Sequence, residues 1–326
     1  MPLFIDERPY DEDRGLKMIY SSFKAAELLP ERRLCQRDGV LYVGEREFAL
    51  CVAKGRLAER TPKYLVSDEA TTCAIVALHD PERSIALIAH LDGADTVSHV
   101  RQIFVEFRAA LSAQSVESSD DISVSAHLLG CFLPAETRDK YRRQCLVVLR
   151  ELHHQSAQFH LQLSLQTAVI GELNSGATEG APKYRGLAIE PAGGRVFPAG
   201  CGAPRGPFRR LRDLRRTFGP TPDALSLLPC FDWRSATFKL EPFEYRVDEA
   251  MARFVLRMDD AWIRKNLSTS PAAESEGFAA AIRATYAFAL EHPYWWRHFT
   301  SADGNVGQLK ALELTWNSAS GEWEKG

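Results

Sequence analysis

The stretch that decides the fold of this chain runs from Ser67 to Thr96 and reads SDEATTCAIVALHDPERSIALIAHLDGADT. Two runs of apolar and β-branched residues, 74–78 and 85–89, are separated by the turn-forming sequence HDPER. This pattern predicts a buried β-hairpin. Because a hairpin brings its far ends side by side, we expect Cys73 and His90 to lie together at one end of the sheet.

Cys73 and His90 form a candidate catalytic pair. A free cysteine has a pKa of about 8.5 and becomes a useful nucleophile when a nearby imidazole stabilises its thiolate. The alternative is structural, since free cysteine is among the most buried residue types and a histidine at a strand end is commonly a hydrogen-bonded surface residue. Polar residues from Ser67 to Thr72 offer a third group to orient the imidazole, although such residues are also ordinary in loops.

The composition indicates an ordinary globular protein. The chain has 326 residues, of which 45% are hydrophobic and 25% charged, and its net charge is −3. This balance favours neither nucleic acid nor membrane as a partner. The acidic start MPLFIDERPYDEDR lacks the features of a secretory signal, so the sequence predicts an intracellular protein of the cytoplasm, and also of the nucleus.

The cysteines and the known cofactor motifs exclude several classes of site. The seven cysteines are scattered and include no CxxC pair, which argues against a disulfide framework and against a zinc ribbon. The sequence also has no P-loop, no GxGxxG after a strand and no HExxH. No nucleotide or metal cofactor is therefore expected.

Hydrophobic periodicity predicts one α+β domain over residues 1–326, with helices covering a system of antiparallel strands. Helices are expected around 22–29 and at 97–111, 136–155 and 278–290. Strands are expected at 41–51 (two short or one bent), 122–132, 159–165, 184–190 with 194–197, 231–233, 238–245 and 309–323. Aspartates in the turn at 92–95 are candidates to cap the following helix.

The segment 199–222 differs in character from the rest of the chain. It holds six arginines between Gly-Pro pairs, namely Arg205, Arg209, Arg210, Arg212, Arg215 and Arg216. An interaction patch and a solvated surface insertion are both compatible with this composition, and the surface insertion is favoured. The partner of such a patch is unknown.

With these elements placed, the chain resembles the protein N-terminal asparagine amidohydrolase family. The matching residues are SDEATTC at 67–73 with the strand after it, HLDGADT at 90–96, and NLSTSP at 266–271 followed by a helix that ends at EHP, 291–293. Weaker matches are MPL at 1–3, the 41–50 stretch and HLLGCF at 127–132. A collinear set of this kind is more specific than one Cys–His spacing.

The resemblance implies hydrolysis of the side-chain amide of N-terminal asparagine to aspartate, a step that feeds the arginine branch of the N-degron pathway. The Cys73–His90 spacing is also similar to that of chemotaxis receptor glutamine deamidases and deamidating cytotoxic necrotizing factor toxins, which share a Cys–His core on a helix-flanked β-sandwich. The implied roles are Cys73 as nucleophile, His90 as base and Ser67 as the orienting member. Glu69, Leu91 and the Arg-rich segment depart from the family pattern.

Other site residues follow less directly. The backbone N–H of Cys73 and a group of Thr72 are candidates to stabilise the oxyanion, although Thr72 is equally well explained as a loop residue. Asp68 and Asp92 are candidates to bind the substrate α-ammonium, but turn aspartates more often cap backbone. Ser268 and Thr269 lie in the NLSTSP motif and are candidates to line the pocket, with helix capping as the alternative.

Two other function classes remain open from the sequence. A protein-glutamine deamidase acting on internal residues would keep Cys73 and His90 but ignore the substrate N-terminus. A non-catalytic module that binds N-termini is disfavoured by the presence of both a nucleophile and a base.

Overall fold

A mixed sheet forms the centre of the molecule. The computed structural model describes residues 3–23, 30–114, 122–175, 180–203, 205–219, 226–300 and 309–325. Within them, eight strands follow the order β13-β5-β8-β7-β9-β10-β1-β2. They are β1 (Leu3–Ile5), β2 (Arg8–Pro9), β5 (Glu47–Val52), β7 (Ala74–Asp80), β8 (Ile85–Leu91), β9 (Ile122–Gly130), β10 (Leu161–Ile170) and β13 (Leu228–Pro229).

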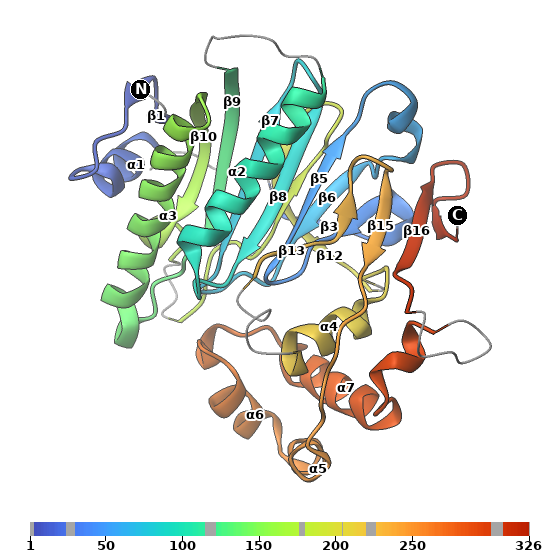
Figure 1. Ribbon diagram of the computed structural model, residues 1–326. Helices are drawn as coiled ribbons and strands as arrows, with labels where there is room; N and C mark the ends of the chain where they lie inside the picture. The colour runs from blue at the N-terminus through green and yellow to red at the C-terminus, as the bar shows by residue number, and fades with distance from the viewer. Residues whose placement is uncertain are drawn as a thin grey trace.

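Helices α1 (Gly15–Phe23), α2 (Thr96–Ala113) and α3 (Arg138–Gln158) cover one face of this sheet (Figure 1). Asp95 begins α2, since its carboxylate accepts a hydrogen bond from the Ser98 N–H at 3.2 Å. Apolar residues recur at helical spacing on α2 and are buried against the sheet, among them Val100, Ile103 and Phe107. The predicted amphipathic pattern therefore supplies the core between helices and sheet.

A second sheet packs on the opposite face of the central sheet. Its strand order is β3-β12-β11-β6-β4, with β3 (Arg32–Leu34), β4 (Val40–Tyr42), β6 (Tyr64–Ser67), β11 (Leu187–Ile189) and β12 (Val196–Cys201). Ile75 and Ile88 belong to the core between the sheets, whereas Val76 and Ala89 belong to the core under the helices. Strands β7 and β8 are thus buried on both sides, which explains their continuous apolar runs.

The C-terminal part of the chain adds helices at one end of the sheets and a third sheet beside them (Figure 1). The helices are α4 (Arg209–Phe218), α5 (Glu249–Arg257), α6 (Asp260–Leu267) and α7 (Phe278–Glu291). The strands are β14 (Phe231–Asp232), β15 (Thr237–Leu240), β16 (Leu312–Asn317) and β17 (Glu322–Glu324). Leu211 and Leu214 of α4 join the core between the two larger sheets. No helix in the described part of the chain is long and apolar enough to cross a membrane.

The structure confirms the predicted α+β fold, the hairpin at 74–89 and the helices at 97–111, 136–155 and 278–290. The helix expected around 22–29 differs: α1 ends at Phe23, and residues 24–29 lie outside the described residues. Helices α4, α5 and α6 were not predicted. Strand pairing is mainly antiparallel, but the pairs β1–β10, β9–β10, β3–β12, β5–β13 and β4–β6 are parallel. The β9–β10 pair is parallel because α3 crosses over between these two strands.

The Arg-rich segment contains a helix, α4, that is partly buried. Arg212 is only 3% exposed, and its guanidinium donates to the Glu47 carboxylate and, at 2.7 Å, to the carbonyl oxygen of Tyr42. Arg215 contacts Glu47 at 2.9 Å. The interpretation as a solvated surface segment is wrong for these two arginines, since a buried carboxylate such as Glu47 requires charged partners. That the segment is an insertion stays a prediction.

Candidate active site

Cys73 and His90 face the same side of the central sheet. His90 lies opposite Ile75 in the β7–β8 pairing, so its side chain points toward the second sheet, as that of Ile75 does. Cys73 precedes Ile75 by two residues and packs against the same core. Both residues line one pocket at the open end of the hairpin. The structure therefore brings together the two residues that the sequence singled out.

Ser67 contacts the imidazole of His90 from the second sheet. It is the last residue of β6, and its Oγ atom is 2.9 Å from His90 Nδ1. Both side chains are buried. His90 Nε2 is also buried and has no hydrogen-bond partner among the described residues. One ring nitrogen is thus in contact with Ser67, while the other has no hydrogen-bond partner among the described residues.

The pocket has an acidic side and an apolar side. Carboxylates of Glu45, Asp68, Glu69, Asp213 and Glu274 line it, together with the guanidinium groups of Arg209 and Arg216. Helices α6 and α7 contribute the apolar wall, from Leu267, Phe278, Ile282 and Tyr286. Within the described ranges, no group of three or more His, Cys, Asp or Glu side chains could hold a metal ion.

Burial leaves both members of the Cys–His pair uncharged at neutral pH. Burial raises the pKa of the Cys73 thiol, and the Glu45 carboxylate, whose Oε1 atom is 4.0 Å from Sγ, raises it further. Burial lowers the pKa of His90, although Glu45 opposes this shift. Burial therefore favours the neutral thiol over the stabilised thiolate expected from the sequence.

The pKa values of two carboxylates in the pocket, Glu45 and Glu274, shift in opposite directions. Burial acts to raise the pKa of Glu45, but the ion pair with Arg216 outweighs burial, and the pKa of Glu45 is lowered. Burial raises the pKa of Glu274, against a hydrogen bond from the Ser268 hydroxyl. Glu45 is thus a charged group at neutral pH.

Backbone contacts fix the position of Cys73. Its carbonyl oxygen accepts a hydrogen bond from the Cys131 N–H at 2.7 Å, and the Thr71 carbonyl accepts one from the Phe132 N–H at 2.9 Å. Gly130 has φ +116°, and a Cβ atom there would lie 2.2 Å from the Cys73 carbonyl oxygen. Glycine is therefore required at 130 for this close approach.

The NLSTSP motif lies against the residues before Cys73. The hydroxyls of Thr269 and Thr72 are 3.4 Å apart, and Ser270 donates to Thr71 Oγ1 at 2.8 Å. Ser268 and Thr269 line the pocket, as the sequence led us to expect, and Ser268 donates to the Glu274 carboxylate. The motif thus forms one wall of the site.

The two aspartates expected near the α-ammonium already have partners. Asp68 is buried in the pocket wall, where its Oδ2 accepts from the Cys201 N–H at 2.7 Å and from Arg205 at 3.0 Å. Burial raises the pKa of Asp68 to about 6. Asp92 lies 3.5 Å from Arg46 and is not among the residues that line the pocket. An ammonium-binding role for either residue stays a prediction.

Sequence reasoning missed Glu45, Glu274 and Arg216. Glu45 lies in the polar sequence GERE between two strands, a signal that could have marked it as a pocket residue. Glu274 follows the NLSTSP motif by three residues. Arg216 had no local signal, since its partner Glu45 is 171 residues away.

Fold and site together define a class of protein. It is an α+β two-sheet sandwich in which a cysteine and a histidine line one pocket at the end of a hairpin and a buried serine contacts the histidine, an arrangement suited to thiol-dependent acyl transfer.

Comparison with known proteins narrows this class to one family. A family model described as protein N-terminal asparagine amidohydrolase matches residues 31–318. A human protein of that name is 30% identical over 298 residues, which cover 88% of this chain and 84% of the human protein. The Arabidopsis thaliana protein of that name is 23% identical over 303 residues, which cover 89% of this chain and 82% of that protein. This chain belongs to the protein N-terminal asparagine amidohydrolase family.

Proposed function

We propose that this protein hydrolyses the side-chain amide of an N-terminal asparagine in proteins or peptides, giving N-terminal aspartate and ammonia. The observation that carries the proposal is the family match over residues 31–318, which spans the pocket where Cys73 and His90 meet. The product would enter the arginine branch of the N-degron pathway, in the cytoplasm or nucleus, as the family resemblance implies.

Acylation is the first half of the proposed reaction. Cys73 Sγ attacks the amide carbon of the asparagine side chain, and the thiol proton passes to His90 Nε2. For Nε2 to accept it, Nδ1 must carry a hydrogen and donate it to Ser67 Oγ, 2.9 Å away. The imidazolium then donates its proton to the departing ammonia, and a thioester to Cys73 remains.

Deacylation reverses these proton movements. His90 takes a proton from water, whose oxygen attacks the thioester carbon, and returns a proton to the departing Cys73 sulfur. Both tetrahedral intermediates carry an oxyanion, which we assign to the backbone N–H of Cys73 with a neighbouring group of Thr72. Hydrogen bonds that hold the 71–73 segment against residues 130–132 support this assignment, because they fix the donors in advance.

An acidic pocket suits a substrate that begins with an α-ammonium. Asp68 remains our candidate for binding this group, because it lines the pocket and its Oδ1 atom is buried without a hydrogen-bond partner among the described residues. Asp92 is the second candidate. Glu274 and Ser268 add a further acceptor in the same wall.

Ammonia release from matched peptides tests the proposal. A peptide beginning with free asparagine is expected to be hydrolysed, and Cys73→Ala to be inactive. Acetylation of that peptide removes a charged hydrogen bond worth roughly 1.5–3 kcal/mol, so its rate should fall by about tenfold or more. A peptide with N-terminal glutamine should also be a poor substrate, because its longer side chain carries the amide carbon past the thiol. A peptide with internal asparagine should be poor because that residue has no α-ammonium.

Three results would contradict the proposal. Comparable rates on free and acetylated asparagine peptides would assign the protein to the general deamidases. Faster hydrolysis of an internal-glutamine peptide would do the same. Binding of the asparagine peptide without ammonia release would assign it to the non-catalytic binding modules.

A further inference from the structure

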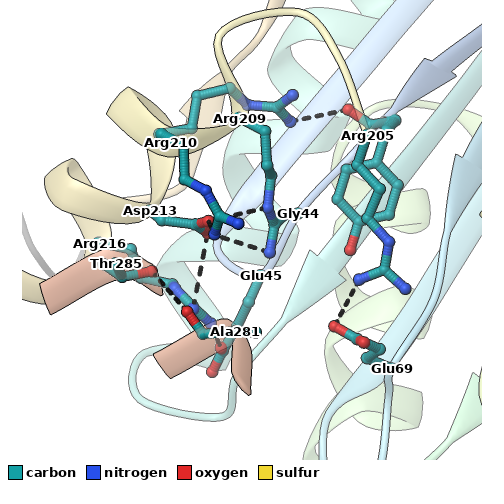
Figure 2. Close-up of polar contacts among 12 residues, drawn as sticks. Gly44, Glu45, Glu69, Arg205, Arg209, Arg210, Asp213, Arg216, Ala281 and Thr285 are labelled. Atoms are coloured by element: carbon teal, nitrogen blue, oxygen red, sulfur yellow. Dashed lines mark hydrogen bonds and ion pairs between the residues drawn. The ribbon is translucent and has the colours of Figure 1, made fainter. Parts of the chain in front are cut away.

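A charged pair that the proposed reaction does not use lies beside the thiol. Glu45 belongs to the loop between β4 and β5, and its Oε1 atom is 4.0 Å from Cys73 Sγ. Its other carboxylate oxygen, Oε2, accepts a hydrogen bond from the Arg216 guanidinium on α4. Figure 2 shows Arg216 reaching Glu45 from the helix, with Asp213 on the same helix close by.

The loop that carries Glu45 is fastened to the catalytic hairpin and to α4. The Arg46 N–H donates to the His90 carbonyl oxygen at 2.9 Å. The Arg46 guanidinium donates to the Arg216 carbonyl oxygen at 2.9 Å and lies 3.5 Å from the Asp92 carboxylate. Glu45 and Arg216 are therefore held at the open end of the hairpin.

Charged and titratable groups face Cys73 from each neighbouring element. They are Glu45 from the β4–β5 loop, Arg216 from α4, His90 and Asp92 from β8 and the turn after it, Glu274 from the segment before α7, and Cys131 directly after β9. Asp92 is balanced by Arg46, and Glu274 accepts from Ser268. Glu45 is the carboxylate nearest the sulfur, and Arg216 is the cation that balances it.

We propose that Glu45 and Arg216 are positioning residues for the thiol chemistry, in which Arg216 balances the charge of Glu45 so that Cys73 can release its proton to His90. The proposal rests on the proposed function only for the role of Cys73. Without Arg216, the negative charge of Glu45, 4.0 Å from the sulfur, would oppose formation of a Cys73 thiolate. Without Glu45, the positive charge of Arg216 would favour the thiolate. Removing either partner should therefore act on the thiol with opposite sign.

The first measurement is the rate at which iodoacetamide alkylates Cys73 as a function of pH, detected by mass spectrometry of the peptide that contains Cys73. The second is the pH profile of kcat/KM. Arg216→Gln should move the alkylation midpoint up by about one pH unit and lower kcat/KM at pH 7 about tenfold. Glu45→Gln should move the midpoint down by about one pH unit. The double variant Glu45→Gln/Arg216→Gln should return to within about threefold of wild type.

Two further variants separate charge from structure. Arg216→Lys keeps the charge and should stay near the wild-type midpoint. Arg210→Gln removes an exposed arginine of the same helix, paired with Asp213 at 3.8 Å, and should leave both readouts unchanged. If Arg216→Gln fails to fold, Glu45→Gln and Arg216→Lys still test the predicted signs.

Midpoints that move in the same direction in both single variants, or a double variant no better than Arg216→Gln, would overturn the proposal. Because alkylation needs no turnover, the outcome is independent of the substrate. Opposite shifts in a protein that releases no ammonia from an asparagine peptide would uphold the pair and reject the proposed function.

Discussion

At the scale of single residues, the polar group in contact with His90 Nδ1 is a hydroxyl and not a carboxylate. The Ser67 hydroxyl is neutral, so it can hold the ring in place but gives little stabilisation to an imidazolium. Negative charge comes instead from Glu45, which acts to raise the pKa of His90 against the effect of burial. Orientation and charge are thus supplied to His90 by two different residues.

Ser67→Ala should lower kcat about 10- to 100-fold with little change in KM, because the imidazole loses the hydrogen-bonding group that holds its ring in place. Steady-state kinetics on the asparagine peptide would measure this effect. Ser156→Ala is the matched control, since Ser156 is also fully buried but donates to the His153 carbonyl oxygen on α3. A KM effect without loss of kcat would contradict an orienting role.

At the scale of elements, the entry to β7 is held by the end of β9. Gly130 is the last residue of β9 and lies close to the Cys73 carbonyl oxygen. Because of this close approach, the Cys131 N–H can donate a hydrogen bond to that oxygen. The backbone N–H that we assign to the oxyanion also belongs to Cys73. The register of β7 on β9 therefore positions the nucleophile.

Gly130→Ala should destabilise the protein by at least about 2 kcal/mol and abolish turnover, because its Cβ would clash with the Cys73 carbonyl oxygen at a left-handed φ. Urea unfolding and ammonia release would measure the two effects. Gly277→Ala is the control, since φ is −76° there and a Cβ would meet no described atom within 4 Å. Equal stability of the two variants would contradict the close approach.

At the scale of the whole molecule, the two stacked sheets bury histidines as well as aliphatic residues. His127 on β9 is 7% exposed, and its Nδ1 lies 3.2 Å from the Thr167 hydroxyl. Burial lowers the pKa of His127 to about 4, with a smaller contribution from His79. Folding therefore requires this imidazole to be neutral.

His127 should make the protein less stable as the pH falls. In the unfolded chain its pKa is about 6.5, so the unfolded state binds the extra proton first as the pH falls. Stability is therefore lost between about pH 6.5 and 4, by roughly 3 kcal/mol from this residue, and is unaffected by it above pH 6.5. Urea unfolding across this range should show a weaker pH dependence for His127→Gln than for wild type.

The sequence by itself determined the features that arise from short-range spacing. Alternating and helical hydrophobic patterns depend on neighbours a few residues apart, so they predicted the hairpin, α2 and α3, and they placed Cys73 and His90 at one end of β7–β8. The family motifs then indicated the reaction. Each of these conclusions needed no knowledge of how the sheets pack.

Only the tertiary structure decided which distant groups meet. Ser67 reaches His90 because β6 stacks on β8 from another sheet. Arg212 is buried because Glu47, 165 residues away, is buried opposite it. Composition alone indicates a solvated face for an arginine-rich helix, since an arginine is buried only where packing supplies a partner for its charge. That partner lies far away in the sequence, and no local pattern records it.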